Sequence, residues 1–260
     1  MDCYPGRQLD DTAKTVIGLL TSNFAVIYSS QGTRRDLIEV SVGYALILIA
    51  VWTPLHVERI IFWLAFSWIV STVLLARNDR DMLGLGLSGL PSSLWILGIA
   101  LAFASLDLLI STWYSALHPL YGPVPVGRHM WGYMIWALMQ QFVLQDFFLL
   151  RLVRLLPTRT AAVFTAAALF ATAHVPNPLL TVATMFWGVV ACLLFLKYRN
   201  LYVLGIVHGI LGLCIAVSIP NAIHHHMRVG IGYLRYHPDQ AALNRADVSG
   251  HVRGTPGAAQ

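Results

Sequence analysis

Seven runs of mostly apolar residues, each close to the length of a membrane-crossing helix, constrain this chain more than any other feature. A transmembrane helix needs roughly 20 consecutive apolar residues. Hydrophobic residues make up 57% of the chain and charged residues only 11%, whereas soluble domains carry about 25% charged residues. The sequence therefore predicts an all-α fold, a polytopic membrane helix bundle. The predicted spans are 37–54, 60–76, 93–114, 130–151, 160–175, 179–197 and 201–219.

The ends of the chain are more polar than the bundle. Residues 15–29 are short and only moderately apolar, so we expect an interfacial helix or an eighth transmembrane helix there. We predict a cytoplasmic or interfacial segment over 1–36, a membrane bundle over 37–236, and a polar, flexible tail over 237–260.

Arginine and lysine lie mostly in the loops on one side of the bundle, which predicts a cytoplasmic N-terminus. The C-terminal tail then lies outside although it also carries arginines, and an extra span or a re-entrant turn near 220–234 would remove this conflict. The net charge of +5 is explained by such flanking residues. No basic stripe interleaved with aromatic residues is visible, so we expect a lipid bilayer and no nucleic acid as partner.

Three glutamines lie inside the predicted span 130–151, at a depth where polar side chains are costly and usually serve function. At about 100° per residue, Gln140, Gln141 and Gln145 share one side of a straight helix, and Asp146 points elsewhere. Glutamines can simply join helices through side-chain hydrogen bonds. Three of them within about two turns favour a functional cavity instead.

Two histidines also lie in apolar segments. His174 ends one predicted span, and His208 lies in the last one between glycines 205, 209 and 212, which allow a helix or a ligand to approach closely. A buried imidazole is costly unless it is paired. We therefore predict a polar chamber shared by three helices.

Depth along the helices indicates which group faces the histidines. His174 and His208 together lie at about the depth of Gln140, while Asp146 lies nearer the inner surface. The Gln140–Gln141 pair is therefore their expected partner. Two chemistries stay open for the chamber. His174 and His208 could bind a divalent metal such as zinc, since imidazole is the commonest metal-binding side chain, or the chamber could hold no metal and position a water for hydrolysis.

These residues, in this order, resemble the CPBP family of intramembrane endopeptidases, also called the CAAX protease or Abi family. The motifs of that family are EExxxR, FxxxH, and a histidine often followed four residues later by asparagine. The stretch FATAH, from Phe170 to His174, fits the second motif, and LYVLGIVHGILG resembles the third, with His208 in place and Gly212 at the asparagine position. The resemblance implies a family-like core at about 130–219.

The first motif departs from the family pattern. QQFVLQ places Gln140 and Gln141 at the glutamate positions and Gln145 at the arginine position. A second frame takes Asp146 and Arg151, which have the right separation, but it puts an aromatic residue at the second glutamate. The distance to the FxxxH motif favours the glutamine frame.

The resemblance implies that the first glutamate activates a water and that the histidines form an oxyanion or metal site. Glutamine keeps the shape of glutamate but cannot take a proton, and general base catalysis is commonly worth about 10²–10⁴-fold. The residues expected to be catalytic are His174, His208, Gln140, Gln141 and Asp146. Those expected to bind are Gln145, Arg151 and Phe170.

Three functions follow as hypotheses. The first is an endopeptidase of the bacterial inner membrane that hydrolyses a membrane-associated or CAAX-type substrate, with Asp146 as the base. The second is a catalytically inactive relative that acts as a membrane binding or scaffold protein. The third is a small transporter, suggested by acidic residues within the spans, although no inverted repeat is visible.

Other polar or reactive residues allow simpler interpretations. Asp107 either forms a hydrogen bond to a neighbouring Trp or Ser or enters the chamber. The run from His224 to His226 allows a metal site, but a solvated tail is the expected state. Cys192 and Cys214 lie in apolar segments, where a thiol usually serves as a small hydrophobic side chain.

Overall fold

The computed structural model describes residues 30–76, 80–117 and 126–236, and within these ranges it is a helical bundle without strands. Each of the seven predicted spans coincides with a helix. The candidate eighth helix at 15–29 and the tail from 237 onward lie outside the described residues.

Five long helices form most of the bundle. They are α2 (Ser30–Trp52), α3 (Leu55–Leu75), α4 (Leu90–Trp113), α8 (Pro178–Tyr198) and α9 (Leu201–Ser218). A sixth rod is continuous but changes its winding, and consists of α5 (Val126–Phe142), the π-helix η1 (Val143–Leu149) and α6 (Leu150–Leu155). The shorter elements are α7 (Arg159–Thr172), α10 (Asn221–His224), the 3₁₀-helix η2 (His225–Met227) and α11 (Gly230–Leu234).

Within the described ranges, five segments are long and apolar enough to cross a membrane, which makes this an integral membrane protein. They are Val57–Leu75, Leu90–Trp113, Met130–Leu155, Pro178–Tyr198 and Leu201–Ser218. Helix α7 has 14 residues and so measures about 21 Å, which is shorter than the hydrocarbon core of about 30 Å. Helix α2 is long enough, but its first third carries charged residues.

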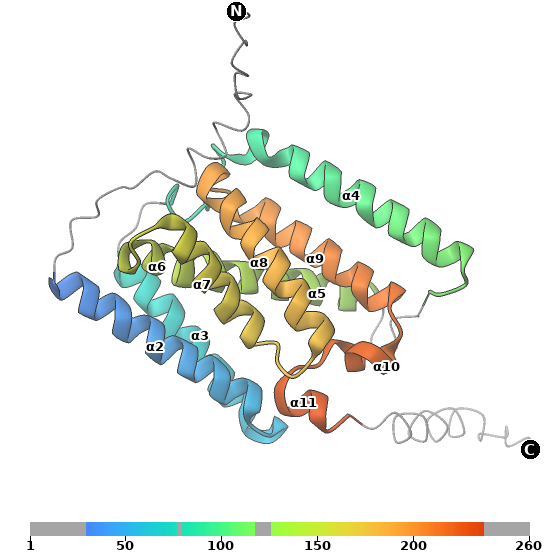
Figure 1. Cartoon of the computed structure of the whole chain (residues 1–260), viewed down its shortest axis with the longest axis horizontal. Helices are drawn as coiled ribbons and strands as arrows, with labels where there is room; N and C mark the ends of the chain where they lie inside the picture. The colour runs from blue at the N-terminus through green and yellow to red at the C-terminus, as the bar shows by residue number, and fades with distance from the viewer. Residues whose placement is uncertain (1–29, 77–79, 118–125, 237–260) are drawn as a thin grey trace, which may run out of the picture.

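Helix pairs set the architecture (Figure 1). Helix α5 packs along α9, α7 along α8, α4 along α9, and α2 along α3. Helices α2 and α4 lie on opposite sides of the central group in Figure 1. The largest apolar cluster surrounds the π-helix and includes Phe147, Phe195 and Leu204. The π-helix therefore lies in the most densely packed part of the molecule.

The segment after α9 folds back onto the bundle. The Gly230 amide donates to the Val175 carbonyl at 3.0 Å. The Asn177 side chain donates to the carbonyls of His224 and Arg228 at 2.9 and 3.0 Å. Neither α10 nor α11 approaches spanning length, so this segment forms a packed end cap and not an additional span.

The histidine run lies in this cap, and the expectation of a solvated tail is wrong for it. His224 is buried, its Nδ1 accepts from the Met227 amide at 3.0 Å, and its Nε2 donates to the Ile219 carbonyl at 2.8 Å. The ring of His225 stacks on Tyr233 at 4.0 Å between centroids. Hydrogen bonds from the His224 side chain to nearby backbone groups hold this run in place, and composition alone does not reveal them.

Candidate functional site in a membrane chamber

A cavity of about 1090 Å³ opens between α4, α5, α8, α9 and the end cap. Its polar lining includes Gln140, His174, His208, Tyr133 and Thr184, and its walls include Trp95, Phe103, Trp136, Phe186 and Trp187. A second cavity of about 150 Å³ lies against α2, α3, α5 and α7 and shares Gln140 and His174 with the first. The predicted chamber thus exists, and two of its predicted residues lie where the cavities meet.

Glycines on α9 bring this helix against α5, as the sequence predicted. A Cβ atom at Gly205 would lie 2.5 Å from Leu138 Cδ1, and one at Gly209 would lie 2.3 Å from Met134 Sδ. Any larger residue would force the helices apart. This close approach brings His208 into reach of the α5 glutamines.

A chain of hydrogen bonds connects two of the glutamines to His208. Gln145 Nε2 donates to Gln141 Oε1 at 3.1 Å, and Gln141 Nε2 lies 3.2 Å from His208 Nδ1. All three side chains are buried. Since the Gln141 carbonyl accepts from Gln145, its NH₂ group donates to Nδ1, so His208 is neutral and carries its proton on Nε2. His208 also contacts the backbone carbonyl of Ala137.

His174 is held by the backbone of its own helix end. It lies in the turn after α7, where the following prolines stop the helix. Its Nδ1 lies 2.7 Å from the Phe170 carbonyl. A carbonyl only accepts, so Nδ1 carries the proton and Nε2 keeps a free lone pair. Because His174 lines both cavities, it is the better candidate of the two histidines to accept a proton.

Aromatic rings frame both imidazoles. Phe170, predicted to bind, meets His174 edge-on at 4.9 Å and His208 at 5.8 Å between ring centroids. The Trp187 ring lies 6.2 Å from that of His208. The indole N–H of Trp187 is buried and has no hydrogen-bond partner among the described residues. The FxxxH phenylalanine therefore orients the histidines, and Trp187 retains an unused donor.

Tyr133 occupies the space next to Gly212, the position where the third motif has asparagine. A Cβ at Gly212 would lie 2.0 Å from the Tyr133 hydroxyl, and Tyr133 lines the large cavity. The hydroxyl thus lies one helical turn from His208. Sequence reasoning missed this residue, although its position seven residues before Gln140 places it on the same helix face.

Asp146, in the π-helix, lies away from the chamber. Asp146 is buried, its carboxylate has no hydrogen-bond partner in the described structure, and it lines neither cavity. Its electrostatic neighbour is Arg199, after α8. The cavity lining therefore includes Gln140, His174 and His208, while Gln141 lies behind it, hydrogen-bonded to His208, and Asp146 lies outside it. The predicted role of Asp146 as catalytic base has no support from its position.

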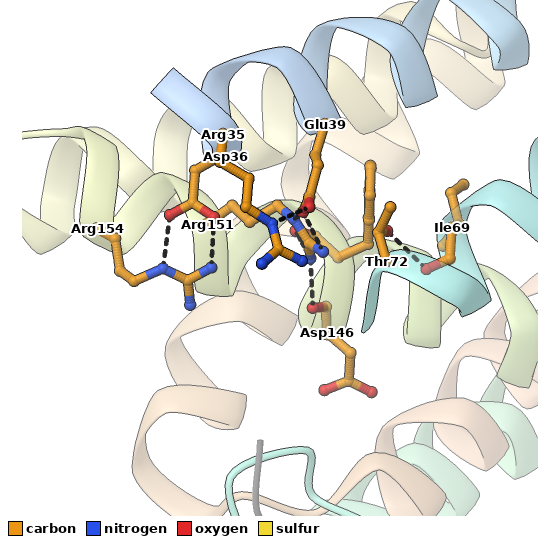
Figure 2. A network of polar contacts seen from close by, with 9 residues as sticks. Arg35, Asp36, Glu39, Ile69, Thr72, Asp146, Arg151 and Arg154 are labelled. Carbon is orange, nitrogen blue, oxygen red and sulfur yellow. Dashed lines mark hydrogen bonds and ion pairs between the residues drawn. The ribbon is translucent and has the colours of Figure 1, made fainter. Parts of the chain in front are cut away.

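Arg151, predicted to bind, lies on the other side of the rod and is 1% exposed. Figure 2 shows its guanidinium beside Glu39 of α2 and the Asp146 carboxylate pointing away from both. Arg151 Nε donates to Glu39 Oε2 at 2.8 Å, and Arg35 Nε donates to Glu39 Oε1 at 2.7 Å. Arg151 is thus a structural ion-pair partner and not a group of the chamber.

An acidic residue of α4 lines the large cavity at a distance from His208. Asp107 of α4 accepts a short hydrogen bond from Ser218 and contacts Cys214, both on α9. Ser218 follows His208 by ten residues, which is about 15 Å along a helix. The chamber is therefore long, and the Asp107 carboxylate lies well away from His208 along α9; a second carboxylate, that of Glu58 on α3, also lines the cavity.

A zinc site does not fit this arrangement. Catalytic zinc takes three protein ligands, and no group of three His, Cys, Asp or Glu side chains suited to a metal occurs in the described ranges. His174 Nε2 is available, but His208 uses Nδ1 to accept from Gln141 and carries a proton on Nε2. The pair would have to break its present hydrogen bonds to bind a metal.

Comparison with known proteins agrees with the motif resemblance. Residues 126–214 match the family described as type II CAAX prenyl endopeptidase Rce1-like, and the match covers about a third of the chain. No curated protein and no solved structure gives a significant match. The matched segment contains the three glutamines, both histidines and Gly212, so this chain is a CAAX-protease-like membrane protein whose chamber lies in the part similar to that family.

Proposed function

We propose that this protein binds a membrane-associated peptide of the CAAX type in the chamber and does not cleave it. The hydrogen-bond chain from Gln145 through Gln141 to His208 carries the proposal. Amides stand where the resemblance implies ionisable groups, and the His208 imidazole is already engaged by the Gln141 amide and the Ala137 carbonyl. No carboxylate of the described residues lies beside it to activate a water.

The chamber keeps features suited to recognition. A ligand pocket is usually apolar with a few converging polar groups, and this cavity has aromatic walls with the Gln140 amide, the Tyr133 hydroxyl and the His174 ring along one side. An amide donates and accepts, which matches a peptide backbone group. The volume of about 1090 Å³ lies slightly above the usual range for ligand pockets, about 300–1,000 Å³. An extended apolar peptide suits this space.

Site-specific photocrosslinking of the full chain in lipid vesicles tests the proposal. A photoreactive amino acid at Ala183, which lines the cavity, should capture a fluorescent farnesylated CAAX-type peptide. The control position is Val182, which is 71% exposed and outside the cavity lining. Saturable capture at 183 of a peptide with unchanged mass supports the proposal. Equal capture at both positions contradicts specific binding, and a shortened peptide contradicts the absence of cleavage.

One observation favours the endopeptidase as a second candidate. His174 Nε2 has a free lone pair at the junction of the two cavities, and histidine is the most frequent general base in enzymes. In that case Nε2 takes a proton from the water that attacks the peptide carbonyl, and the Tyr133 hydroxyl donates to the developing oxyanion. Turnover that His174→Ala abolishes would establish this candidate over binding alone.

A further inference from the structure

The π-helix changes the winding of the rod between Gln141 and Arg151. A straight helix turns about 100° per residue, whereas a π-turn holds more residues per turn and is often found at functional sites. Here the change in winding begins at Val143, between Gln141 and Gln145, and ends at Leu149. Within this stretch Gln145 bonds to Gln141, whereas the Asp146 carboxylate has no partner among the described residues and lines neither cavity.

Arg151 contacts the backbone of this π-helix directly. Its Nη1 donates to the carbonyl of Asp146 at 3.3 Å and to that of Phe147 at 3.1 Å. Its guanidinium carbon also lies 4.4 Å from the centroid of the Phe147 ring. Three contacts from one rigid, planar cation thus fix the last turn of the π-helix.

Glu39 holds Arg151 in that position from a different helix. Arg151 Nη2 lies 2.7 Å from Glu39 Oε2, and Glu39 itself is 7% exposed. Near Glu39 on α2, Gly43 packs so closely that a Cβ there would lie 2.5 Å from Phe147 Cζ. Helix α2 lies outside the segment 126–214 that matches the family, so this support comes from another part of the chain.

We propose that Glu39 and Arg151 are positioning residues of the chamber, which hold the π-helix in the register that presents Gln145 to Gln141 and keeps Asp146 away. Through Gln145 and Gln141 this register also sets the proton position on His208. The proposal concerns the order of side chains and goes beyond the proposed binding function. Its test does not depend on whether a bound peptide is cleaved.

The chain contains a matched control for the Glu39–Arg151 ion pair, which we call the clamp. Asp36 and Arg154 form a second ion pair between the same two helices, with Arg154 Nε 2.7 Å from Asp36 Oδ2. No contact between Arg154 and the carbonyls of the π-helix is found. Loss of either pair removes one link between α2 and α6, but only loss of the Glu39–Arg151 pair releases the π-helix.

Nitrogen-15 NMR of the histidine rings tests the proposal in the full chain, with the His208 signals assigned by their loss in His208→Asn. The wild type should show one His208 tautomer, with unprotonated Nδ1 and protonated Nε2. Glu39→Gln and Arg151→Lys should each replace this single state by shifted or doubled signals. Asp36→Asn should leave it unchanged.

Two further variants keep the test decisive if Glu39→Gln does not fold. Glu39→Asp keeps the negative charge but has a shorter side chain, so it should give a smaller shift of the His208 signals. The double variant Glu39→Gln with Arg151→Met has a neutral pair that cannot donate to the π-helix carbonyls, so it should still shift these signals. A clamp that serves stability alone would lower the unfolding temperature and leave the His208 signals of every folded variant unchanged. That result, or an equal shift in Asp36→Asn, would overturn the proposal.

Discussion

The two sides of the rod Val126–Leu155 are both polar and buried, yet they are built from opposite chemistry. On the chamber side, the Gln140 amide and two imidazoles line a cavity of about 1090 Å³, and the amides of Gln141 and Gln145 lie behind His208. On the α2 side, a full ion pair between Glu39 and Arg151 lies in close packing. The groups hydrogen-bonded to His208 are thus neutral, whereas the buried contact with α2 is an ion pair. The comparison indicates that the charged pair serves architecture and the neutral chain serves recognition.

The largest expected effect belongs to the ionic side. Arg151→Ala leaves Glu39 without its buried partner, and breaking a buried pair typically costs about 3–5 kcal/mol. Arg154→Ala should cost about 1 kcal/mol or less, because the Arg154 side chain is 39% exposed and exposed pairs contribute little. Equilibrium unfolding of both variants in the same detergent measures the difference. Equal losses would remove the distinction between the inner and outer ion pairs.

The next effect concerns the close contact that builds the chamber side. Gly205→Val places a branched side chain against Leu138, whose Cδ1 would lie 2.5 Å and whose Cα 3.1 Å from a Cβ. Overpacking of this kind costs about 1–3 kcal/mol. Gly98→Val on α4 is the control, since nothing lies within 4 Å of a Cβ there. Similar unfolding free energies for the two variants would show that α5 and α9 do not depend on this contact.

Breaking the hydrogen-bond chain from Gln145 to His208 should lower the unfolding free energy by a comparable or smaller amount. Gln141→Leu leaves His208 Nδ1 and Gln145 without their shared partner, and an unsatisfied buried polar group costs about 1–3 kcal/mol. Gln140→Leu should cost clearly less, because Gln140 faces the cavities. The unfolding free energies of Gln141→Leu and Gln140→Leu, measured in the same detergent, show which glutamine supports His208. A larger loss for Gln140→Leu would mean that the wrong glutamine has been assigned to His208.

The smallest stability effect is expected for a substitution that only fills space. Ala183→Trp places an indole in the large cavity and should change the unfolding free energy by less than about 1 kcal/mol, in the range usual for sites outside the packed core. It should nevertheless abolish saturable binding of the farnesylated peptide, measured by fluorescence anisotropy. Val182→Trp should leave binding intact. Unchanged binding in Ala183→Trp would place the ligand outside the chamber.

Sequence patterns were sufficient for the helices and for much of the chamber. Apolar runs located seven helical segments, five of which are long and apolar enough to span a membrane. Depth along the helices paired the glutamines with the histidines, as the contact between Gln141 and His208 bears out. The glycine spacing on α9 predicted its close approach to a neighbour. These features depend on local periodicity, which a single sequence carries.

The remaining features depend on contacts between distant residues or on a change in winding. The π-helix breaks the rule of about 100° per residue that the helix geometry assumes, so Arg151 could not be placed correctly. Glu39 lies 112 residues before Arg151, and no local pattern connects them. His224 was mistaken for a solvated residue because its partners are backbone carbonyls and amides.

Cleavage of a farnesylated CAAX-type peptide by the purified chain in lipid vesicles tests the central claim most directly. The proposed function is binding without cleavage, because amides stand where the resemblance implies carboxylates, so the wild type should release no fragment. Gln140→Glu combined with Gln141→Glu restores carboxylates beside His208 and should produce measurable cleavage, provided that the variant folds and still binds the peptide. Fragment release by the wild type that His174→Ala abolishes would contradict the account.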